Sequence, residues 1–321
     1  MKRRSFLAAG LCLVLSACGG DRSAQSDGIT IGYQKGGLLF VAATRGVVGK
    51  TLEAQGIAPV RWVQFPSGPP LIEAMRAGSV DYGVVGDTPI AYAQASGNDL
   101  RYVAAHTYPN AVSGGLIVPN GASIRSAADL KGKRLAFTKG SAAELSAVVA
   151  LKKHGLTLKD LTPVYLTPAD AITAFANRSI DAWLTWDPYR TLAEQRFGAR
   201  EVEIDRAGLR ASEFYIARGA FVRDRPKALI ALLDALRDEA GWASAHRDGV
   251  ARLTAAATGL SPGVVHQMQD RYGNDAFAVN PIIPADIANQ QRVSDYLTEA
   301  GILTRKIDAK AAAWTGWTPN P

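Results

Sequence analysis

The sequence predicts an α/β protein made of two similar lobes, and three observations lead to that fold class. Short strand-like apolar runs alternate with helix-like segments over residues 28–218, a pattern typical of parallel α/β sheets. The stretch Ser79-Val-Asp-Tyr-Gly-Val-Val-Gly-Asp-Thr-Pro89 returns 100 residues later as Ser179-Ile-Asp-Ala-Trp-Leu-Thr-Trp-Asp-Pro188. Residues 18–321 also provide enough chain to bury two hydrophobic cores.

The first 17 residues are expected to be an export signal. Three basic residues at positions 2–4 precede an apolar run at 8–15. A membrane span needs roughly 20 apolar residues, so this run is too short to be one. The adjacent Arg3 and Arg4 also resemble a twin-arginine signal, so the general and the twin-arginine export routes both stay open.

The end of this signal resembles the cleavage box of bacterial lipoproteins. Leu15-Ser-Ala-Cys18 has the form Leu-x-small-Cys at a suitable distance from the basic start. Cleavage there would leave Cys18 as a lipidated N-terminus, followed by a small, polar tether over 18–27. The alternative is an ordinary signal peptide that is cut after Ala17. We therefore expect a periplasmic protein, anchored to a membrane through Cys18.

Composition limits the possible kinds of cross-link and partner. The two cysteines are Cys12, inside the signal, and Cys18, so the mature chain has no second cysteine with which to form an internal disulfide. Without the three basic residues of the signal, 33 basic residues face 29 acidic ones, which gives a net charge of +4. These charges do not form the basic clusters of a nucleic-acid-binding surface, and we expect no nucleic-acid partner.

The first lobe is expected to alternate strands with helices. The turn at 66–70 opens a helix that Gly78 ends, and the next strand runs into Asp87-Thr88-Pro89. This tripeptide predicts a helix start, because proline fits the first turn and a side-chain oxygen can cap free N–H groups. The expected strands are 29–33, 60–65, 82–85 and 101–106, and the expected helices are 38–50, 71–77 and the segment after Pro89.

The second lobe is expected to repeat the first. Its predicted elements are strand 116–119, a short helix at 126–132, strand 134–137 and helix 142–154. An offset of 104 residues relates 33–37 to 137–141, and an offset of 100 residues applies after a shorter turn. An offset kept across a helix, a turn, a strand and a helix start indicates an internal duplication. The pairs at offset 100 are Ile72 and Ile172, Ala74 and Ala174, Ser79 and Ser179, Asp81 and Asp181, and Asp87 and Asp187.

The rest of the chain is expected to return to the first lobe. Strand 213–218 is predicted to cross back, and helices near 225–239, 242–258, 261–272 and 284–299 are expected to pack outside the first lobe. The predicted organisation is a signal peptide at 1–17, a tether at 18–27, a first lobe at 28–113 plus 219–321, and a second lobe at 114–218.

Two such lobes facing each other predict an anion-binding cleft. Ligands of open parallel sheets bind beyond the carboxyl ends of the strands, where helix starts present unpaired N–H donors and a partial positive charge. Small residues at these points let a backbone N–H group approach a ligand closely. Four helix starts are expected there: after Lys35-Gly36, at Thr88, at Gly140-Ser141 and at Asp187-Pro188.

Six motifs carry a family resemblance over about residues 28–317. They are Tyr33-Gln-Lys-Gly36, Gly86-Asp-Thr-Pro89, Ala128-Asp-Leu-Lys-Gly132, Phe137-Thr-Lys-Gly-Ser141, Tyr165-Leu-Thr-Pro-Ala-Asp170 and Asp181-Ala-Trp-Leu-Thr-Trp-Asp-Pro-Tyr189. Together they resemble the periplasmic aliphatic-sulfonate-binding proteins of ABC importers, a group that also includes taurine- and nitrate-binding proteins.

The resemblance implies two parallel-sheet α/β lobes, joined by a two-strand hinge, that close on the ligand, as in type II-like periplasmic binding proteins. It implies a monomer without a cofactor that delivers aliphatic sulfonates to a permease in the inner membrane for sulfur acquisition. A sulfonate stays anionic at every relevant pH and needs several N–H or O–H donors. The small residues of 108–115, at the expected cleft mouth, leave the accepted size of the organic tail open.

The expected ligand donors lie on loops of both lobes. Thr88 is the first candidate, with a hydroxyl and an N–H group at a helix start, and plain capping is the alternative. Gly140 and Ser141 are its counterparts in the second lobe. The first loop adds Gln34, Lys35, Gly36 and Gly37, where Lys35 could meet the sulfonate or stay solvated, and Ser113 and Gly114 could supply further donors at the first crossing.

Three further residues have open roles. Trp186 could form an apolar wall for the ligand's tail or belong to the core. Asp187 suits an anion site poorly, so we expect it to cap the next helix, to pair with Lys35 or Lys139, or to hold the amine of a zwitterionic ligand. Tyr215 could be a wall residue on the return strand, whereas Asp81 and Asp181 are expected to be turn residues rather than ligands.

Two alternative functions share this fold. A binding protein for taurine, nitrate or an aromatic acid would fit the same lobes. An enzyme on this fold, such as a desulfinase or a thiamine-pyrimidine synthase, would need a catalytic cysteine or clustered histidines. His106, His154, His246 and His266 are scattered without the spacing of a metal site, and no nucleophile elbow or P-loop occurs, so an enzyme is not expected.

Overall fold

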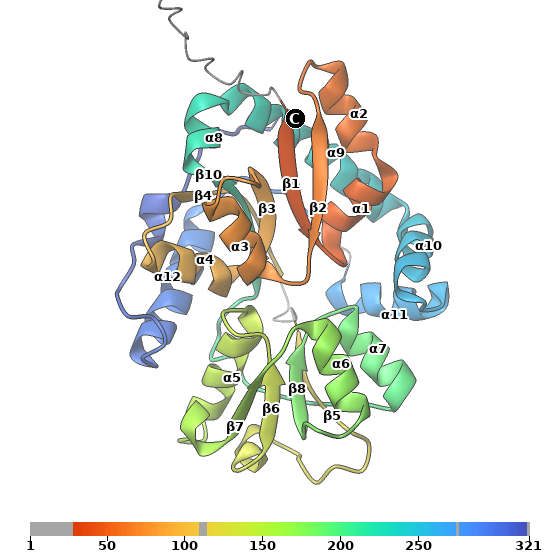
Figure 1. Ribbon diagram of the computed structural model, residues 1–321, viewed down its shortest axis with the longest axis vertical. Coiled ribbons are helices and arrows are strands. Elements are labelled where there is room, and N and C mark those ends of the chain that lie inside the picture. Colours follow the sequence, from red (N-terminus) through yellow and green to blue (C-terminus); the bar gives the residue numbers. More distant parts are fainter. Residues whose placement is uncertain (1–27, 109–113, 274–275, 320–321) are drawn as a thin grey trace, which may run out of the picture.

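The structure, a computed structural model, describes residues 28–108, 114–273 and 276–319. These residues form two α/β lobes, drawn one above the other in Figure 1, each with a five-stranded sheet. The expected signal peptide, the tether and two site residues, Cys18 and Ser113, lie outside the described residues. In the part of the chain that is described, no helix combines the length and the apolarity needed to cross a bilayer.

The first lobe begins with alternating strands and helices. Its sheet has the order β2-β1-β3-β10-β4, and β1 pairs in parallel with both β2 and β3. The elements are β1 (Ile29–Gln34), α1 (Gly37–Arg45), α2 (Val47–Ala54), β2 (Val60–Phe65), α3 (Gly68–Arg76), β3 (Tyr82–Gly86), α4 (Asp87–Ala95) and β4 (Leu100–Thr107).

The second lobe has a sheet with the order β7-β6-β8-β5-β9. Its elements are β5 (Gly115–Val118), η1 (Ala127–Leu130), β6 (Arg134–Phe137), α5 (Ala142–Lys152), η2 (Leu158–Asp160), β7 (Thr162–Tyr165), α6 (Pro168–Ala176), β8 (Ala182–Thr185), α7 (Tyr189–Phe197) and β9 (Arg200–Val202).

The chain then returns to the first lobe and ends in helices. These last elements are β10 (Ser212–Arg218), α8 (Gly219–Asp224), α9 (Pro226–Ala245), α10 (Arg247–Thr258), α11 (Pro262–Tyr272), α12 (Pro284–Glu299) and η3 (Ala309–Ala312).

The internal duplication appears in both sheets and in individual hydrogen bonds. The parallel triplet β2-β1-β3 of the first lobe corresponds to β7-β6-β8 of the second. The Thr30 N–H group donates to the Asp81 carboxylate at 2.9 Å, and the Arg134 N–H group donates to the Asp181 carboxylate at 2.7 Å. These pairs are related by the offsets 104 and 100, and they make Asp81 and Asp181 equivalent structural residues.

The sheets are mixed, whereas the sequence predicted parallel sheets. The two crossing strands cause the difference: β5 runs antiparallel to β8 and β9, and β10 runs antiparallel to β3 and β4. β10 hydrogen-bonds in the first sheet, although the predicted second lobe extends to residue 218. Each lobe thus receives one antiparallel strand at the point where the chain enters it.

Both faces of the first sheet are buried, as a sheet covered by helices on both sides requires. Side chains alternate along β10: Phe214 and Ile216 pack with α3 and α4, and Tyr215 packs with α1 and α9 on the other face. Glu213 therefore projects from the same face as Tyr215. Tyr215 is 1% exposed and its hydroxyl donates to the Ala278 carbonyl at 3.0 Å, so it is a core residue rather than the wall residue that was considered.

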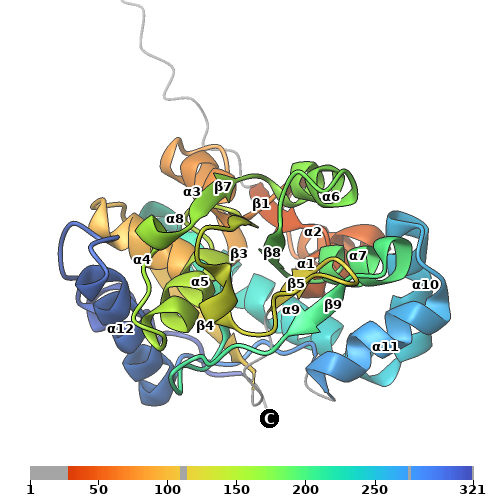
Figure 2. The ribbon, with the colours of Figure 1, turned by 90° about the horizontal axis from the view of Figure 1, so that it is seen from below.

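The C-terminal helices contact both lobes, although they were expected to pack outside the first. Figures 1 and 2 place α12 and α11 on opposite sides of the molecule. On one side, Leu145 and Val149 of α5 pack against Val293 and Leu297 of α12. On the other, Leu192 of α7 packs in one cluster with Val265 of α11. The two lobes are thus in contact along both flanks.

Three helix boundaries differ from the sequence prediction. The helix expected at 38–50 is divided because Gly46 adopts a left-handed conformation with φ of 69° and ends α1. Helix α3 begins at Gly68 rather than at residue 71, because its two prolines fit the first turn. Helix α9 continues through Gly241 to Ala245, where a break had been expected after residue 239.

Candidate functional site

A cavity of about 150 Å³ lies between the lobes, many times the volume that one water molecule needs. It is at the carboxyl ends of β1 and β3, where the duplication predicts a ligand site. Residues of both lobes and of α11 line it. The predicted site residues among its lining are Gln34, Lys35, Gly36, Gly37, Ser141, Trp186 and Asp187.

Helix starts from both lobes converge on this cavity. Gly36 and Gly37 begin α1 with φ angles of 106° and 73°, a region that favours glycine, and no side chain caps that helix. Gly86 begins α4, also without a side-chain cap. Since the first N–H groups of a helix have no partner within it, the start of α1 offers donors to an anion. At the start of α4, the Thr88 N–H group bonds to the Asp87 carboxylate and Pro89 has no N–H group.

Two further starts complete the set. In the second lobe, Ser141 is the N-cap of α5: its hydroxyl accepts from the Ala143 N–H group at 3.2 Å and donates to the Thr138 carbonyl at 2.6 Å. Ala142, the first residue of α5, also lines the cavity. Gly68, at the start of α3, lines it too, although the sequence prediction did not include it. The two prolines after Gly68 were the available signal.

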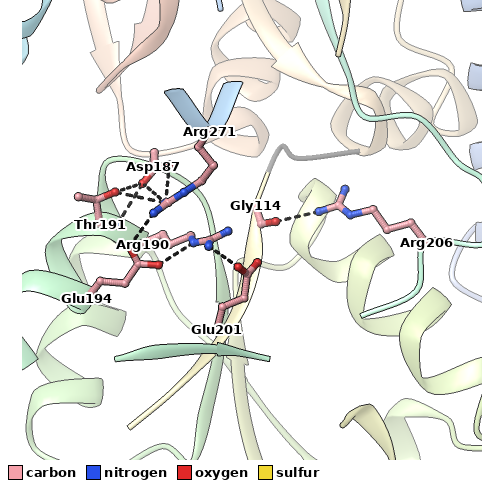
Figure 3. Close-up of polar contacts among 8 residues, drawn as sticks. All are labelled: Gly114, Asp187, Arg190, Thr191, Glu194, Glu201, Arg206 and Arg271. Atoms are coloured by element: carbon pink, nitrogen blue, oxygen red, sulfur yellow. Dashed lines mark hydrogen bonds and ion pairs between the residues drawn. The ribbon is translucent and has the colours of Figure 1, made fainter. Parts of the chain in front are cut away.

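Three predicted donors lie elsewhere. Thr88 is fully buried, and its hydroxyl donates to the Asp87 carboxylate at 2.8 Å, because that buried carboxylate needs donors. The Gly140 N–H group donates to the Glu144 carboxylate at 2.7 Å. Gly114 is outside the cavity lining, and its carbonyl accepts from Arg206 at 3.0 Å (Figure 3). The Thr88 hydroxyl and the Gly140 N–H group thus donate within the protein, and Gly114 lies outside the cavity lining.

The first loop approaches the second lobe closely. A Cβ atom added to Gly36 would lie 3.5 Å from the Pro188 ring, so this loop is in near contact with the start of α7. The Gln34 amide donates to the Val84 carbonyl at 3.1 Å, which fixes the loop to β3. Lys35 lines the cavity and makes no ion pair within the described residues.

Asp187 is neutralised by an arginine that the sequence prediction did not consider. Arg271 of α11 donates to its carboxylate at 3.0 Å, and the Asp187 side chain is only 4% exposed (Figure 3). The N–H group and the hydroxyl of Thr191 donate to the same carboxylate at 3.1 and 2.6 Å. The expected capping of α7 is present, but the partner is Arg271 rather than Lys35 or Lys139.

The network around Arg271 joins the lobes. Arg271 also pairs with Glu194 at 2.7 Å, and Glu194 pairs in turn with Arg190 at 2.9 Å. Glu194 and Arg190 belong to α7 of the second lobe (Figure 3). Helix α11 packs on α10, which contacts α1 and α9 of the first lobe. Burial alone lowers the pKa of Arg271, but Asp187 and Glu194 outweigh burial and raise it.

The cavity has a second carboxylate that sequence reasoning missed, and an aromatic wall of which only Tyr108 lies in the segment 108–115 expected at the cleft mouth. Glu213 lines the cavity together with Tyr108, Tyr272 and Phe277. Burial raises the pKa of Glu213, and a hydrogen bond from the Tyr108 hydroxyl partly offsets that effect. An acidic residue near the start of an otherwise apolar strand was the one signal for it. The three aromatic residues come from separate parts of the chain.

Comparisons with known proteins give a consistent result. The family model described as NMT1/THI5 like matches residues 56–249. The alkanesulfonate-binding protein SsuA from Xanthomonas axonopodis pv. citri, solved with bound MOPS, is 32% identical with a TM-score of 0.83, and the alignment covers 91% of this chain and 99% of that chain. The periplasmic aliphatic sulphonate-binding protein SsuA from Escherichia coli is 30% identical with a TM-score of 0.77, covering 92% of this chain and 94% of that chain.

Two other relatives extend the comparison. The taurine-binding periplasmic protein of Escherichia coli (strain K12) is 25% identical over 255 residues, 75% of this chain and 78% of the relative. The desulfurization enzyme DSZB shares the fold at 18% identity and a TM-score of 0.62, with 90% of this chain and 97% of that chain covered. The same two-lobed fold therefore occurs in both binding proteins and an enzyme.

Proposed function

Since the chain belongs to the NMT1/THI5-like family, we propose that it is the solute-binding component of an ABC importer and captures aliphatic sulfonates in the cleft between its lobes. The observation that carries this proposal is the convergence of helix starts from both lobes on one cavity: the glycine-containing starts of α1 and α4 in the first lobe, and the start of α5 at Ser141 and Ala142 in the second. Such donors suit an anion that never takes up a proton. The two SsuA structures, which cover nine tenths of the chain at 30% identity or more, support this ligand class.

The proposal assigns a role to each part of the cleft. The sulfonate group would accept from the N–H groups at Gly36, Gly37 and Ala142, with Lys35 close to the same group. Trp186 would contact the organic tail. We also propose that the protein is a monomer in the periplasm, that a lipid at Cys18 anchors it, and that it delivers its ligand to a permease of the inner membrane.

A screen of thermal stability tests this function. The mature chain would be heated with alkanesulfonates of several chain lengths, MOPS, taurine, sulfate and nitrate. A ligand that binds only the folded state raises the melting temperature by mass action. We expect a rise with sulfonates and none with nitrate, and a rise with nitrate alone would contradict the proposal.

Taurine is the second candidate ligand, because a carboxylate in the cavity wall suits a ligand that carries an amine. An enzymatic function has its own test, since desulfination or desulfonation releases sulfite. We expect no release of sulfite from alkanesulfonates or aromatic sulfinates. Measurable release of sulfite would show that the protein is an enzyme rather than a transport component.

A further inference from the structure

Glu144 is a buried carboxylate at the contact between the lobes. It lies in the first turn of α5 in the second lobe, and only 3% of the residue is exposed. Its Oε2 atom accepts from the Tyr92 hydroxyl at 3.0 Å and from the Gly140 N–H group at 2.7 Å. Tyr92 belongs to α4 of the first lobe. The carboxylate therefore joins a residue of the other lobe to the loop that precedes its own helix.

The start of α5 approaches the first lobe at two further points. A Cβ atom added to Gly140 would lie 3.4 Å from the ring of Pro69 in α3. A Cβ atom added to Gly86, at the start of α4, would lie 3.4 Å from the Cβ atom of Ala142. Figure 1 shows α4 above α5 where the lobes meet, and the two helices are in contact. Since Ala142 also lines the cavity, the start of α5 both faces the ligand site and contacts the other lobe.

The hydrogen bonds of Glu144 are not those of ordinary helix capping. The sequence Ser141-Ala-Ala-Glu144 has the form of a capping box, in which the carboxylate accepts from the N–H group of the N-cap residue. Here the Ser141 N–H group donates to the Thr138 carbonyl at 3.3 Å, and the carboxylate accepts from Gly140 instead. Gly140 has a φ of 75°, so Glu144 holds the loop at a residue with a left-handed backbone.

The donors of Glu144 come from both lobes, and one of them depends on closure. A buried carboxylate needs donors, because an unpaired charge in a protein interior is costly. Burial and, to a lesser extent, the Glu144 carboxylate raise the pKa of Tyr92, so the phenol stays neutral and can donate. When the lobes separate, Tyr92 moves away and water takes its place. Water then competes with Gly140 for the same oxygen, so the loop is held less firmly than in the closed state.

We propose that Glu144 is a positioning residue that couples closure of the cleft to the geometry of the helix start at Ser141 and Ala142. In the closed state, the Tyr92 hydroxyl completes the contacts of the carboxylate, and the carboxylate fixes Gly140 and the helix start beside the sulfonate. This inference rests on the proposed function and deepens it, because it assigns a part of the affinity to two residues away from the ligand. Neither Glu144 nor Tyr92 belongs to the described lining of the cavity.

A double-mutant cycle measured by calorimetry tests the coupling. The ligands are methanesulfonate, butane-1-sulfonate and MOPS, and the one that binds the unaltered protein most tightly is used throughout. We expect Tyr92→Phe to weaken its binding about three- to tenfold. Glu144→Met removes the acceptor at similar size and should weaken binding about tenfold or more. With Glu144→Met already present, Tyr92→Phe should change the affinity less than about twofold, since the partner of the hydroxyl is gone.

Hydrogen exchange reports on the loop itself. With saturating ligand, the Gly140 amide should exchange at least about threefold faster in Tyr92→Phe than in the unaltered protein, because the carboxylate then holds the loop less firmly. The variant Glu144→Gln keeps the size of the side chain and one acceptor oxygen, so it should restore part of the affinity that Glu144→Met loses. It also completes the cycle if Glu144→Met does not fold.

Tyr102→Phe is the matched control for the loss of a phenol hydroxyl. The Tyr102 hydroxyl donates to Gln94, and both residues belong to the first lobe. This bond does not depend on the contact between the lobes. The variant should therefore leave the affinity and the exchange of Gly140 unchanged.

The outcomes separate the coupling from the proposed function. An equal loss of affinity from Tyr92→Phe in both backgrounds, the absence of any loss, or unchanged exchange at Gly140 overturns the coupling while sulfonate binding stands. If none of the three sulfonates binds the unaltered protein, the proposed function itself is wrong and the coupling is lost with it.

Discussion

The ion pair between Arg271 and Asp187 gives a quantitative prediction about closure of the cleft. Arg271 belongs to α11, and Asp187 directly precedes α7, so the pair exists only when the lobes are in contact. The two side chains are 22% and 4% exposed, which makes the pair largely buried. Removing one partner of a buried pair costs about 3–5 kcal/mol, because the remaining charge stays unpaired.

The expected cost is smaller in this case. Thr191 continues to donate its N–H group and its hydroxyl to Asp187, which satisfies part of the carboxylate. We therefore expect Arg271→Gln to destabilise the closed state by about 2 kcal/mol, which corresponds to an affinity about 30 times weaker. The reason is that ligand binding must then supply the free energy of closure that the pair no longer provides.

Calorimetry with the sulfonate that gives the largest thermal shift measures this effect, and small-angle scattering measures closure. A second substitution sharpens the test: Asp187→Asn in the Arg271→Gln background removes the unpaired charge and should restore part of the affinity. Arg247→Gln is the matched control, since Arg247 of α10 pairs with Asp270 of α11, and this pair includes no residue of the second lobe. An affinity of Arg271→Gln within twofold of the unaltered protein would refute the reasoning.

Three other substitutions, two of them with a matched control variant, test the remaining parts of the structure. Ser141→Ala should weaken sulfonate binding several-fold and lower the stability by about 1 kcal/mol. Ser261→Ala, at the N-cap of α11, should lower the stability by a similar amount and leave sulfonate binding unchanged. Equal affinities of the two variants for the sulfonate in calorimetry would contradict this prediction. Gly68→Ala would place a Cβ atom 2.8 Å from a proline ring and should lower the unfolding free energy by about 1–3 kcal/mol. Its control, Gly241→Ala, lies in an exposed and open part of α9 and should raise the unfolding free energy by about 0.5–1 kcal/mol. Urea titration measures both values, and an unchanged stability of the Gly68→Ala protein would show that the contact relaxes freely. A hydrogen bond from an arginine side chain holds the pKa of Asp181 below its usual range, so its contribution to stability is complete above the unfolded pKa of about 3.9 and is lost as the pH falls through the lower folded value. Asp181→Asn should therefore reduce the acid-induced loss of stability below about pH 4, and an unchanged pH profile would argue against this role.

Local sequence patterns predicted most elements and their duplication. The offset of 100 residues predicted that Asp81 and Asp181 are equivalent, because both precede a strand in the same local motif, and the structure gives them equivalent hydrogen bonds. Gly36 and Gly37 line the cavity for a similar reason. Their φ angles are local properties of a loop that precedes a helix.

The directions of β5 and β10 in their sheets could not be predicted from the sequence. A strand's hydrophobic pattern is the same whether its neighbour is parallel or antiparallel, so the sequence could not show that these strands make the sheets mixed. The C-terminal helices posed the same difficulty, since their apolar faces do not specify whether they cover one lobe or two.

The sequence by itself thus determined the two related lobes, the helix starts after Gly36 and before Ala142, and the cleft between them. The tertiary structure decided how the side chains at that cleft are used. Asp187 pairs with Arg271, which is 84 residues away. The reason is physical: backbone donors follow from local chain geometry, whereas a buried charge takes the partner that folding brings to it.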